Sequence, residues 1–315
     1  MRVLIAGATG AVGTSLVPLL VARGLTVVGL TRSVEKTEAL KRLGAEPVVV
    51  DALDAAGLRA AALAARPAVV IHELTAIKGA TDLAHFDRTF AATNRLRTDG
   101  LDYLIAAARE CGARRFIAQS FCGWPYARLG GPVKTEEDAL DPSPPREFAN
   151  TLNAIRHLEG AVTGESAFDG LVLRYGAFYG PKSGLFEPPM VDQVRRRRVP
   201  LIGDGGGWWS FLHVRDAAEA TAIAVERGAP GLYNIVDDDP APVREWLPAL
   251  ARMLGAKPPR RVPRWLARLV AGEHVVAMMT ENRAGSNAKA RRELGWAPAH
   301  SSWRQGFAEV LSRAA

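Results

Sequence analysis

The sequence predicts an α/β fold in which helices cover both faces of a parallel sheet. Short apolar runs recur along the first 180 residues, and segments of helix-forming composition separate them. A strand that is apolar along its whole length is buried on both faces, which is typical of parallel sheets. Because crossovers between parallel strands are right-handed, the alternation indicates a doubly wound sheet.

The individual elements follow from the same alternation. The expected strands are 2–6, 26–30, 47–50, 68–71, 115–118 and 171–175, and the expected helical segments include 34–43, 55–65, 95–111 and 150–163. After residue 180, proline, glycine and tryptophan become dense, which indicates a smaller substrate lobe over the C-terminal edge of the sheet. We expect a sheet domain of residues 1–180, joined by about 211–236, and a lobe made of 181–210 and 237–315.

The composition is that of an ordinary globular protein, with 48% hydrophobic and 23% charged residues. No apolar run approaches the ~20 residues of a membrane span, and no signal peptide is recognised, so we expect a cytoplasmic protein without a membrane partner. The net charge is +7, but the basic residues are dispersed and form no nucleic-acid motif, so no nucleic acid is expected. The two cysteines suggest neither a disulfide framework nor a metal site, and no metal is predicted.

Residues 1–13 predict a binding site for a pyrophosphate. An apolar strand runs into the loop Gly7-Ala8-Thr9-Gly10-Ala11-Val12-Gly13, and a helical pattern follows. Backbone approaches an anion closely only where side chains are absent, and a helix N-terminus presents free N–H groups and partial positive charge. A tight turn without a ligand is the alternative. We assign a dinucleotide to this loop, with contacts from Gly7, Thr9, Gly10, Ala11, Val12 and Gly13.

The end of the second expected strand indicates which dinucleotide is favoured. An acidic residue there would bind the ribose hydroxyls of NAD, but Thr31 and Arg32 stand in its place. An arginine can pair with a 2′-phosphate and Thr31 brings no carboxylate to repel it, so NADP(H) is favoured. If Arg32 is only a solvated side chain, NAD(H) stays open. Asp51, with Ala52 beside it, is expected either at the adenine edge or as the cap of the helix that begins near Asp54.

Further motifs extend over nearly the whole chain. They are Ala92-Thr93-Asn94, the run Leu-Arg-Tyr-Gly-Ala-Phe-Tyr-Gly-Pro over 173–181, Phe-Leu-His-Val-Arg-Asp-Ala-Ala over 211–218, and Glu-Leu-Gly-Trp-Ala-Pro over 293–298. With the glycine-rich loop, they make the chain resemble the extended short-chain dehydrogenase/reductase family, also called the NAD-dependent epimerase/dehydratase family. The resemblance implies a Rossmann sheet and adds Asn94, Tyr175 and Ala177 to the cofactor contacts. Asn94 is expected to brace the neighbouring loop or to cap the following helix. The family does not fix the reaction.

The family's catalytic signature is missing from this chain. The family uses a tyrosine four residues before a lysine, with a serine or threonine opposite, whereas none of the five tyrosines here precedes a lysine at that spacing. Aligned on the family pattern, Thr151 takes the tyrosine position and Ile155 the lysine position. Cys122 takes the serine position. A threonine hydroxyl cannot replace an activated phenol, and Ile155 carries no charge.

The chemistry would then depend on other groups at the rim that follows strand 115–118. Ser120 is expected to hold a substrate oxygen, and Cys122 is expected to act as a weak acid unless it is merely a buried apolar residue. Tyr126 is the one tyrosine near this rim in the sequence. Thr151 is a further hydrogen-bond donor at the emptied site.

The substrate side also departs from the family. Members that act on nucleotide sugars clamp a diphosphate with an arginine where this chain has Trp209. We expect Phe186, Met190, Trp208 and Trp209 to line the lobe, unless they form its core. The predicted function is reduction by NADPH of a small apolar or aromatic carbonyl or enone metabolite. An isomerase or lyase that retains NAD(P) and a non-catalytic dinucleotide sensor are the alternatives, and the sequence leaves open whether the chain forms a homodimer.

Overall fold

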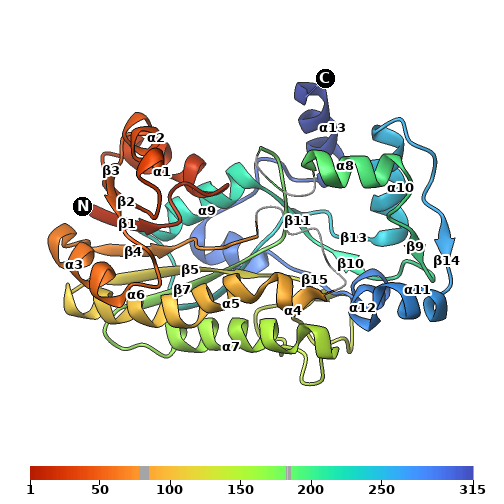
Figure 1. Cartoon of the computed structure of the whole chain (residues 1–315), viewed down its shortest axis with the longest axis horizontal. Coiled ribbons are helices and arrows are strands. Elements are labelled where there is room, and N and C mark those ends of the chain that lie inside the picture. The colour runs from red at the N-terminus through yellow and green to blue at the C-terminus, as the bar shows by residue number, and fades with distance from the viewer. Residues whose placement is uncertain (78–84, 182, 184–185, 315) are drawn as a thin grey trace.

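The computed structural model describes residues 1–77, 85–181, 183 and 186–314. Its centre is a sheet of seven parallel strands in the order β12-β7-β5-β4-β1-β2-β3 (Figure 1). These strands are β1 (Arg2–Ala6), β2 (Thr26–Thr31), β3 (Glu46–Val49), β4 (Val69–His72), β5 (Arg115–Phe121), β7 (Asp169–Tyr175) and β12 (Gly231–Ile235). The predicted doubly wound sheet is confirmed, and all six expected strands lie in it.

Helices cover the sheet on both faces, as Figure 1 shows. One face carries α1 (Gly13–Ala22), α2 (Thr37–Arg42) and α9 (Val214–Ala224), and the other carries α3 (Ala55–Ala65), α5 (Ala91–Arg97), α6 (Asp99–Glu110) and α7 (Ala149–Thr163). Two apolar cores result, because successive residues of each buried strand point to opposite faces: Val3 and Ile5 pack under α1, whereas Leu4 and Ala6 pack against the α3 side. Both faces of the sheet are therefore buried from solvent, as the apolar runs predicted.

Two of these helices are capped by the side chain of the residue that directly precedes them. The Asp54 carboxylate accepts from Gly57 N at 3.0 Å and begins α3, and His213 Nδ1 accepts from Arg215 N at 3.2 Å and begins α9. The N-terminus of α1 has no side-chain cap. Backbone N–H groups at the start of α1 therefore lack the side-chain acceptor that α3 and α9 have.

A second lobe lies beyond the C-terminal ends of the sheet strands, at the right of Figure 1. It consists of α8 (Pro188–Arg195), β9 (Leu201–Ile202), β10 (Trp208–Trp209), β13 (Ala241–Pro242), α10 (Val243–Met253), β14 (Arg261–Val262), α11 (Arg264–Ala271), α12 (Glu273–Thr280) and α13 (Trp303–Ala314). Its core is aromatic, with Phe211, Trp246, Trp303 and Phe307 packed ring against ring.

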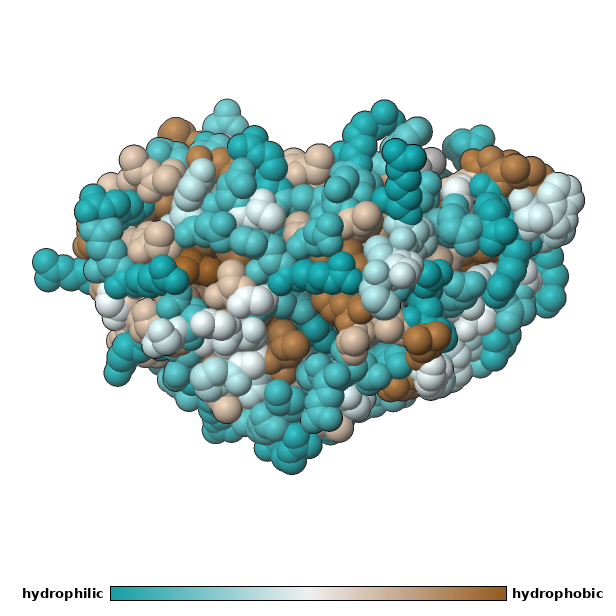
Figure 2. All heavy atoms as spheres, turned by 90° about the horizontal axis from the view of Figure 1, so that it is seen from below, coloured by the Kyte–Doolittle hydropathy of each residue, from teal (hydrophilic) through white to brown (hydrophobic). Residues whose placement is uncertain are grey.

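Two short parallel pairings join the lobe to the sheet. β8 (Ala177–Tyr179) pairs with β11 (Phe211–His213), and β6 (Val133–Lys134) pairs with β15 (Ala284–Gly285). The remaining regular segments are α4 (Phe86–Thr89), the 3-10 turns Val34–Lys36 and Arg146–Phe148, and a π-helical turn, Ala290–Leu294. Among the described residues, no helix is long and apolar enough to cross a bilayer. The face drawn in Figure 2 is largely hydrophilic, with hydrophobic residues in small groups.

Candidate active site

The glycine-rich loop is shaped by contacts that exclude side chains. Gly7 has φ +102, and a Cβ there would overlap the backbone carbonyl of Glu73 at the end of β4. A Cβ at Gly13 would likewise overlap the carbonyl of Gly7. The loop thus presents bare backbone at the uncapped start of α1. These features fit the pyrophosphate of a dinucleotide, which a helix N-terminus attracts.

The segments after β2 and β3 lie where the sequence places the adenosine. Thr31 is buried and its Oγ1 accepts from Ser33 N at 3.2 Å, which shapes the turn, whereas Arg32 is exposed. Asp51 is also exposed, and its carboxylate accepts from Leu53 N at 2.9 Å. The expectation that Asp51 caps the following helix is wrong, because Asp54 does so. The exposed Asp51 and Arg32 both remain candidates for the coenzyme.

Glu73 is a buried carboxyl beside the glycine-rich loop that the sequence did not single out. Tyr175 Oη donates to Glu73 Oε1 at 2.7 Å and lies 2.6 Å from Thr221 Oγ1. Glu73 Oε2 is buried without a hydrogen-bond partner among the described residues. Burial raises the pKa of Glu73 to about 8, so its carboxyl is mostly uncharged at neutral pH. An uncharged carboxyl beside the loop does not repel a pyrophosphate.

Thr151, which stands in the family's tyrosine position, is fully engaged in local hydrogen bonds. Its Oγ1 donates to Asp87 Oδ1 at 2.6 Å and accepts from Asn94 Nδ2 at 3.0 Å. Asp87 also accepts from the backbone N–H groups of Asn150 and Thr151, at 2.9 and 2.8 Å, and so caps α7. Asn94 lies inside α5 and its side chain donates to Thr151, while the following helix, α6, has no side-chain cap. The buried Oδ1 of Asn94 has no partner among the described residues.

Ser120 belongs to a buried polar network beneath the rim. Its Oγ donates to Glu159 Oε1 at 2.7 Å, and Arg174 binds both oxygens of that carboxylate at 2.8 and 2.5 Å. Tyr126 Oη accepts from Arg174 at 3.0 Å and donates to Asn234 Oδ1 at 2.7 Å. The Arg174 and Glu159 side chains are 3% and 8% exposed. Ser120 and Tyr126 therefore have structural partners already and do not offer free hydroxyls to a substrate.

Cys122, in the family's serine position, is buried in an apolar cluster and does not face solvent. It is 1% exposed and lies with Tyr126 and Val236 in a small apolar cluster. A Cβ at Gly285 would overlap its sulfur. Burial raises the pKa of the Cys122 thiol to about 12, so the thiol stays protonated at neutral pH. The alternative of a buried apolar residue describes this environment better than that of a weak acid.

A small pocket lies between the rim and the second lobe. Its lining is Phe121, Cys122, Trp124, Ala177, Trp209, Ser210, Met278 and Asn282. The Trp209 indole donates to the carbonyl of Met278 at 3.1 Å, which fixes the orientation of its ring. Asn282 Nδ2 donates to the carbonyl of Trp208 at 2.8 Å, and its buried Oδ1 has no partner among the described residues. The lining combines the aromatic side chains of Phe121, Trp124 and Trp209 with the polar side chains of Ser210 and Asn282.

The four residues predicted to line the substrate site lie in different parts of the lobe, and only Trp209 belongs to the pocket lining. Trp209 lines the pocket, whereas Trp208 contributes its backbone to hold Asn282. Phe186 packs on Phe307 with ring centroids 5.0 Å apart, in the core of the lobe, and Met190 lies on α8 outside the pocket lining. The sequence missed Trp124, Met278 and Asn282, because Met278 and Asn282 belong to a segment far along the chain.

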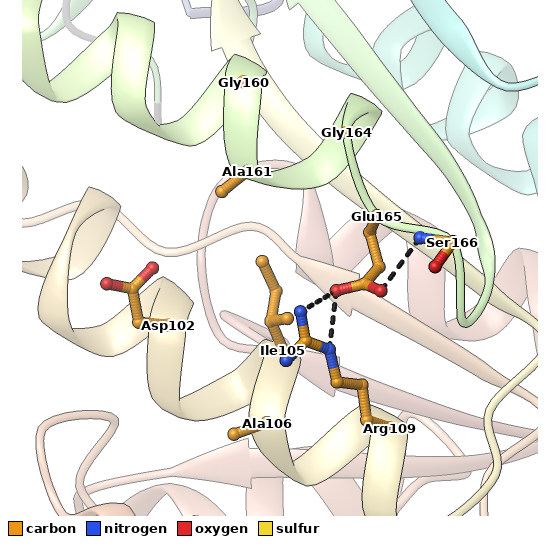
Figure 3. A pocket seen from close by; sticks show the side chains of 9 residues that line it. All are labelled: Asp102, Ile105, Ala106, Arg109, Gly160, Ala161, Gly164, Glu165 and Ser166. Carbon is orange, nitrogen blue, oxygen red and sulfur yellow. Dashed lines mark hydrogen bonds and ion pairs between the residues drawn. The ribbon is translucent and has the colours of Figure 1, made fainter.

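A second hollow lies on the outer surface between α6 and α7 (Figure 3). Arg109 Nε donates to Glu165 Oε2 at 2.6 Å, and Glu165 Oε1 accepts from Ser166 N at 2.8 Å. The Arg109 guanidinium holds the pKa of Glu165 below its usual value. The hollow contains none of the predicted site residues, and its charged side chains already have partners: Arg109 pairs with Glu165, and Asp102 with His157.

Comparisons with known proteins agree with this geometry. A sequence profile of the NAD dependent epimerase/dehydratase family matches residues 3–236, and the chain belongs to this family. Its fold is similar to that of a UDP-glucose 4-epimerase from Thermotoga maritima, with a TM-score of 0.79 and 21% identity over 99% of this chain and 98% of the other.

Two curated relatives match over nearly their whole length. A Streptomyces protein named 3-diazoavenalumate denitrifying reductase is 44% identical, over 98% of this chain and 99% of its own. A Stigmatella aurantiaca ketoreductase, named for a farnesyl-dihydroquinoline oxide, is 28% identical, over 94% of this chain and 92% of its own. The chain is an NAD(P)-dependent oxidoreductase of the short-chain dehydrogenase/reductase type, as the sequence predicted.

Proposed function

We propose that the chain is a reductase of an aromatic diazo compound, in which hydrogen replaces the departing N2. The observation that carries the proposal is that the hydroxyl and thiol groups at the rim are engaged or buried, so no side chain predicted for catalysis is free to donate a proton. The extensive similarity to the denitrifying reductase supports it.

The balance of the reaction explains why the family's acid is dispensable. When bound, a nicotinamide coenzyme supplies a hydride. An arenediazonium cation and a hydride together give the arene and N2, so no proton is transferred to the substrate. Reduction of a carbonyl instead develops an oxyanion, which a positioned donor must stabilise and protonate. Thr151 and Ile155 supply neither the phenol nor the ammonium that would do so.

The lining of the pocket suits a flat cationic ring, and the cavity of about 10 Å³ must widen to admit one. Trp124 and Trp209 both line it, and the negative faces of indole rings attract cations. The partnerless Oδ1 of Asn282 presents the negative end of an amide dipole. The faces of the two indoles and the Asn282 amide oxygen favour positive charge, whereas the Trp209 N–H and the Asn282 Nδ2 already donate to backbone carbonyls. The chain's own part is therefore to orient the ring and to exclude water.

Nitrogen release tests this function. The protein would be incubated with NADPH and a ¹⁵N₂-labelled arenediazonium salt, and with a matched aryl ketone in a second reaction. We expect labelled N2, the arene and oxidised coenzyme in equal amounts, above the rate without protein. Reduction of the ketone alone, without N2 release from the diazonium salt, would favour the carbonyl reductase and overturn the proposal. Asn282→Leu should lower kcat/KM for the diazonium salt about tenfold, consistent with loss of one charge-directed contact.

We further propose NADP(H) as the coenzyme, with Arg32 at the 2′-phosphate. Arg32 is exposed at the end of β2 and Thr31 brings no carboxylate to that turn. Arg32→Gln should weaken NADPH binding about tenfold and leave NADH binding unchanged. Arg42→Gln, at another exposed arginine, is the matched control. Calorimetric titration with each coenzyme measures both, and equal losses for NADPH and NADH would contradict the assignment.

A further inference from the structure

Helix α11 presents an apolar face to solvent. Of its eight residues only Ala267 is buried, while Trp265, Leu266, Leu269 and Val270 are 64%, 39%, 77% and 77% exposed. Residues four apart lie side by side on a helix, so these four side chains form one continuous apolar surface. Single exposed apolar residues are ordinary, but a contiguous patch marks a contact with another body.

Ion pairs connect α11 to neighbouring segments. Arg264 pairs with Asp204 and Glu281, and Arg268 pairs with Glu273, which starts α12. These two arginines are four residues apart and border the apolar surface along one side. In Figure 1 α11 lies at the end of the molecule opposite the N-terminus.

Positive charge accumulates beside the apolar surface. Lys257, Arg260 and Arg261 are exposed in the segment that leads into α11. The basic run Arg195–Arg198 lies against the same segment, since Arg197 Nε donates to the carbonyl of Pro258 at 2.9 Å. Figure 2 shows hydrophobic residues at the right-hand end, the end at which α11 lies in Figure 1.

We propose that α11 and the adjoining basic residues dock the protein on the anionic surface of a lipid bilayer. Indole, leucine and valine side chains with arginines beside them are the composition of helices that lie in the bilayer interface. A second copy of the chain would bring like charges together. A nucleic acid would gain nothing from the four apolar side chains. Such docking needs no membrane-spanning segment, but it replaces the expectation from the sequence that the chain has no membrane partner.

The docking surface is connected to the pocket through the neighbouring helix. α12 packs on α11 and carries Met278, which lines the pocket at the rim. A cationic substrate attracted to the anionic bilayer surface would therefore meet the protein near the element that bounds its pocket. The docking itself does not depend on which reaction the pocket performs.

Vesicle flotation with the full chain tests the proposal. The probes are phosphatidylcholine vesicles, with and without phosphatidylglycerol, at low and high salt. We expect binding at least about tenfold tighter to the anionic vesicles, and weakening of that binding by salt. The double variant L269Q/V270Q should bind about tenfold more weakly than the wild type, and R260Q/R261Q should bind weakly at low salt too.

Matched variants distinguish this surface from general stickiness. V34Q/L129Q replaces two apolar side chains that are 70% and 75% exposed elsewhere, and R42Q/R114Q removes two exposed charges from the sheet domain. Both should bind like the wild type, and all four variants should keep the wild-type melting temperature. Equal binding of L269Q/V270Q and wild type, or equal binding to neutral vesicles, would overturn the proposal. So would a dimer in sedimentation velocity that L269Q/V270Q dissociates, because a second copy would then be the occupant.

Discussion

The glycine-rich loop and the rim after β5 lie at the same edge of one sheet, yet they treat polar groups in opposite ways. The loop leaves backbone amides open at the uncapped start of α1, and no side chain can enter the space at Gly7. At the rim, Ser120 and Thr151 already donate to the carboxylates of Glu159 and Asp87. The difference teaches that the loop has backbone amides to offer a ligand, whereas the hydroxyls of Ser120 and Thr151 are already engaged within the protein.

The largest change in stability is expected when the buried network beneath the rim loses its carboxylate. Glu159→Gln would leave the Arg174 guanidinium buried without its counter-charge and should lower the free energy of unfolding by about 3–5 kcal/mol. Urea unfolding measures the change. The control Glu110→Gln removes the partner of Arg59 in an exposed pair and should cost no more than about 1 kcal/mol. Similar values for the two variants would mean that the network beneath the rim is not what stabilises it.

A single added methyl group in the glycine-rich loop should weaken coenzyme binding. Gly7→Ala places a Cβ on the carbonyl of Glu73, so the loop must shift, and NADPH affinity should fall at least about a hundredfold, or about 2.7 kcal/mol. Gly24→Ala is the control, because Gly24 has φ +77 but a Cβ there would meet nothing within 4 Å, so the substitution introduces backbone strain alone. Coenzyme titration of both variants should separate overlap from strain, and unchanged affinity in Gly7→Ala would place the coenzyme elsewhere.

A smaller effect, counted per pH unit, concerns the protonation of two buried carboxyls. Burial raises the pKa of Glu73 from 4.5 to about 8 and that of Asp237 from 3.8 to about 8. The folded state therefore holds two protons that the unfolded chain releases, so their stabilisation is complete below the unfolded pKa values and is lost as pH rises toward 8. The slope should approach about 1.4 kcal/mol per pH unit for each carboxyl. In urea unfolding measured from about pH 5 to pH 8, Glu73→Gln should remove the part of the pH dependence due to Glu73, and Asp237→Asn the part due to Asp237. A wild-type free energy of unfolding that does not decline over this pH range would refute the assignment.

The smallest effect should come from the residue in the family's tyrosine position. Thr151→Val removes the hydroxyl that donates to Asp87 and accepts from Asn94, and should cost about 1–2 kcal/mol of stability. Turnover of a diazonium substrate should stay within about threefold, since no proton passes through this hydroxyl. NADPH oxidation measures it, with Ser120→Ala and Cys122→Ala alongside. A loss beyond about a hundredfold in any of the three would assign that residue a catalytic role.

Most of the fold could be predicted because its signals are local. Each apolar run of the sheet is contiguous, and the turn after β1 is readable from glycines within seven residues. β12 escaped the set of expected strands, because it includes the polar Asn234 and is an edge strand that follows part of the second lobe. Its partner, β7, lies some sixty residues earlier in the chain.

The candidate site was only partly predictable because its partners are distant in sequence. The rim residues Ser120 and Thr151 were named, but the carboxylates that engage them lie 39 and 64 residues away. Asn282 comes from a segment after α12 that carries no motif. Burial of Glu73 depends on the close approach of Gly7, which composition does not reveal. Local patterns predicted which residues stand at the rim, and tertiary packing decided whether their hydrogen bonds are free.

The two short pairings between the lobe and the sheet, β8 with β11 and β6 with β15, have a consequence for how the molecule denatures. The polypeptide passes from sheet to lobe and returns to complete β12 before leaving again, so neither part can lose its structure without releasing strands from the other. A scanning calorimeter should accordingly record a single endotherm, with calorimetric and van't Hoff enthalpies in agreement.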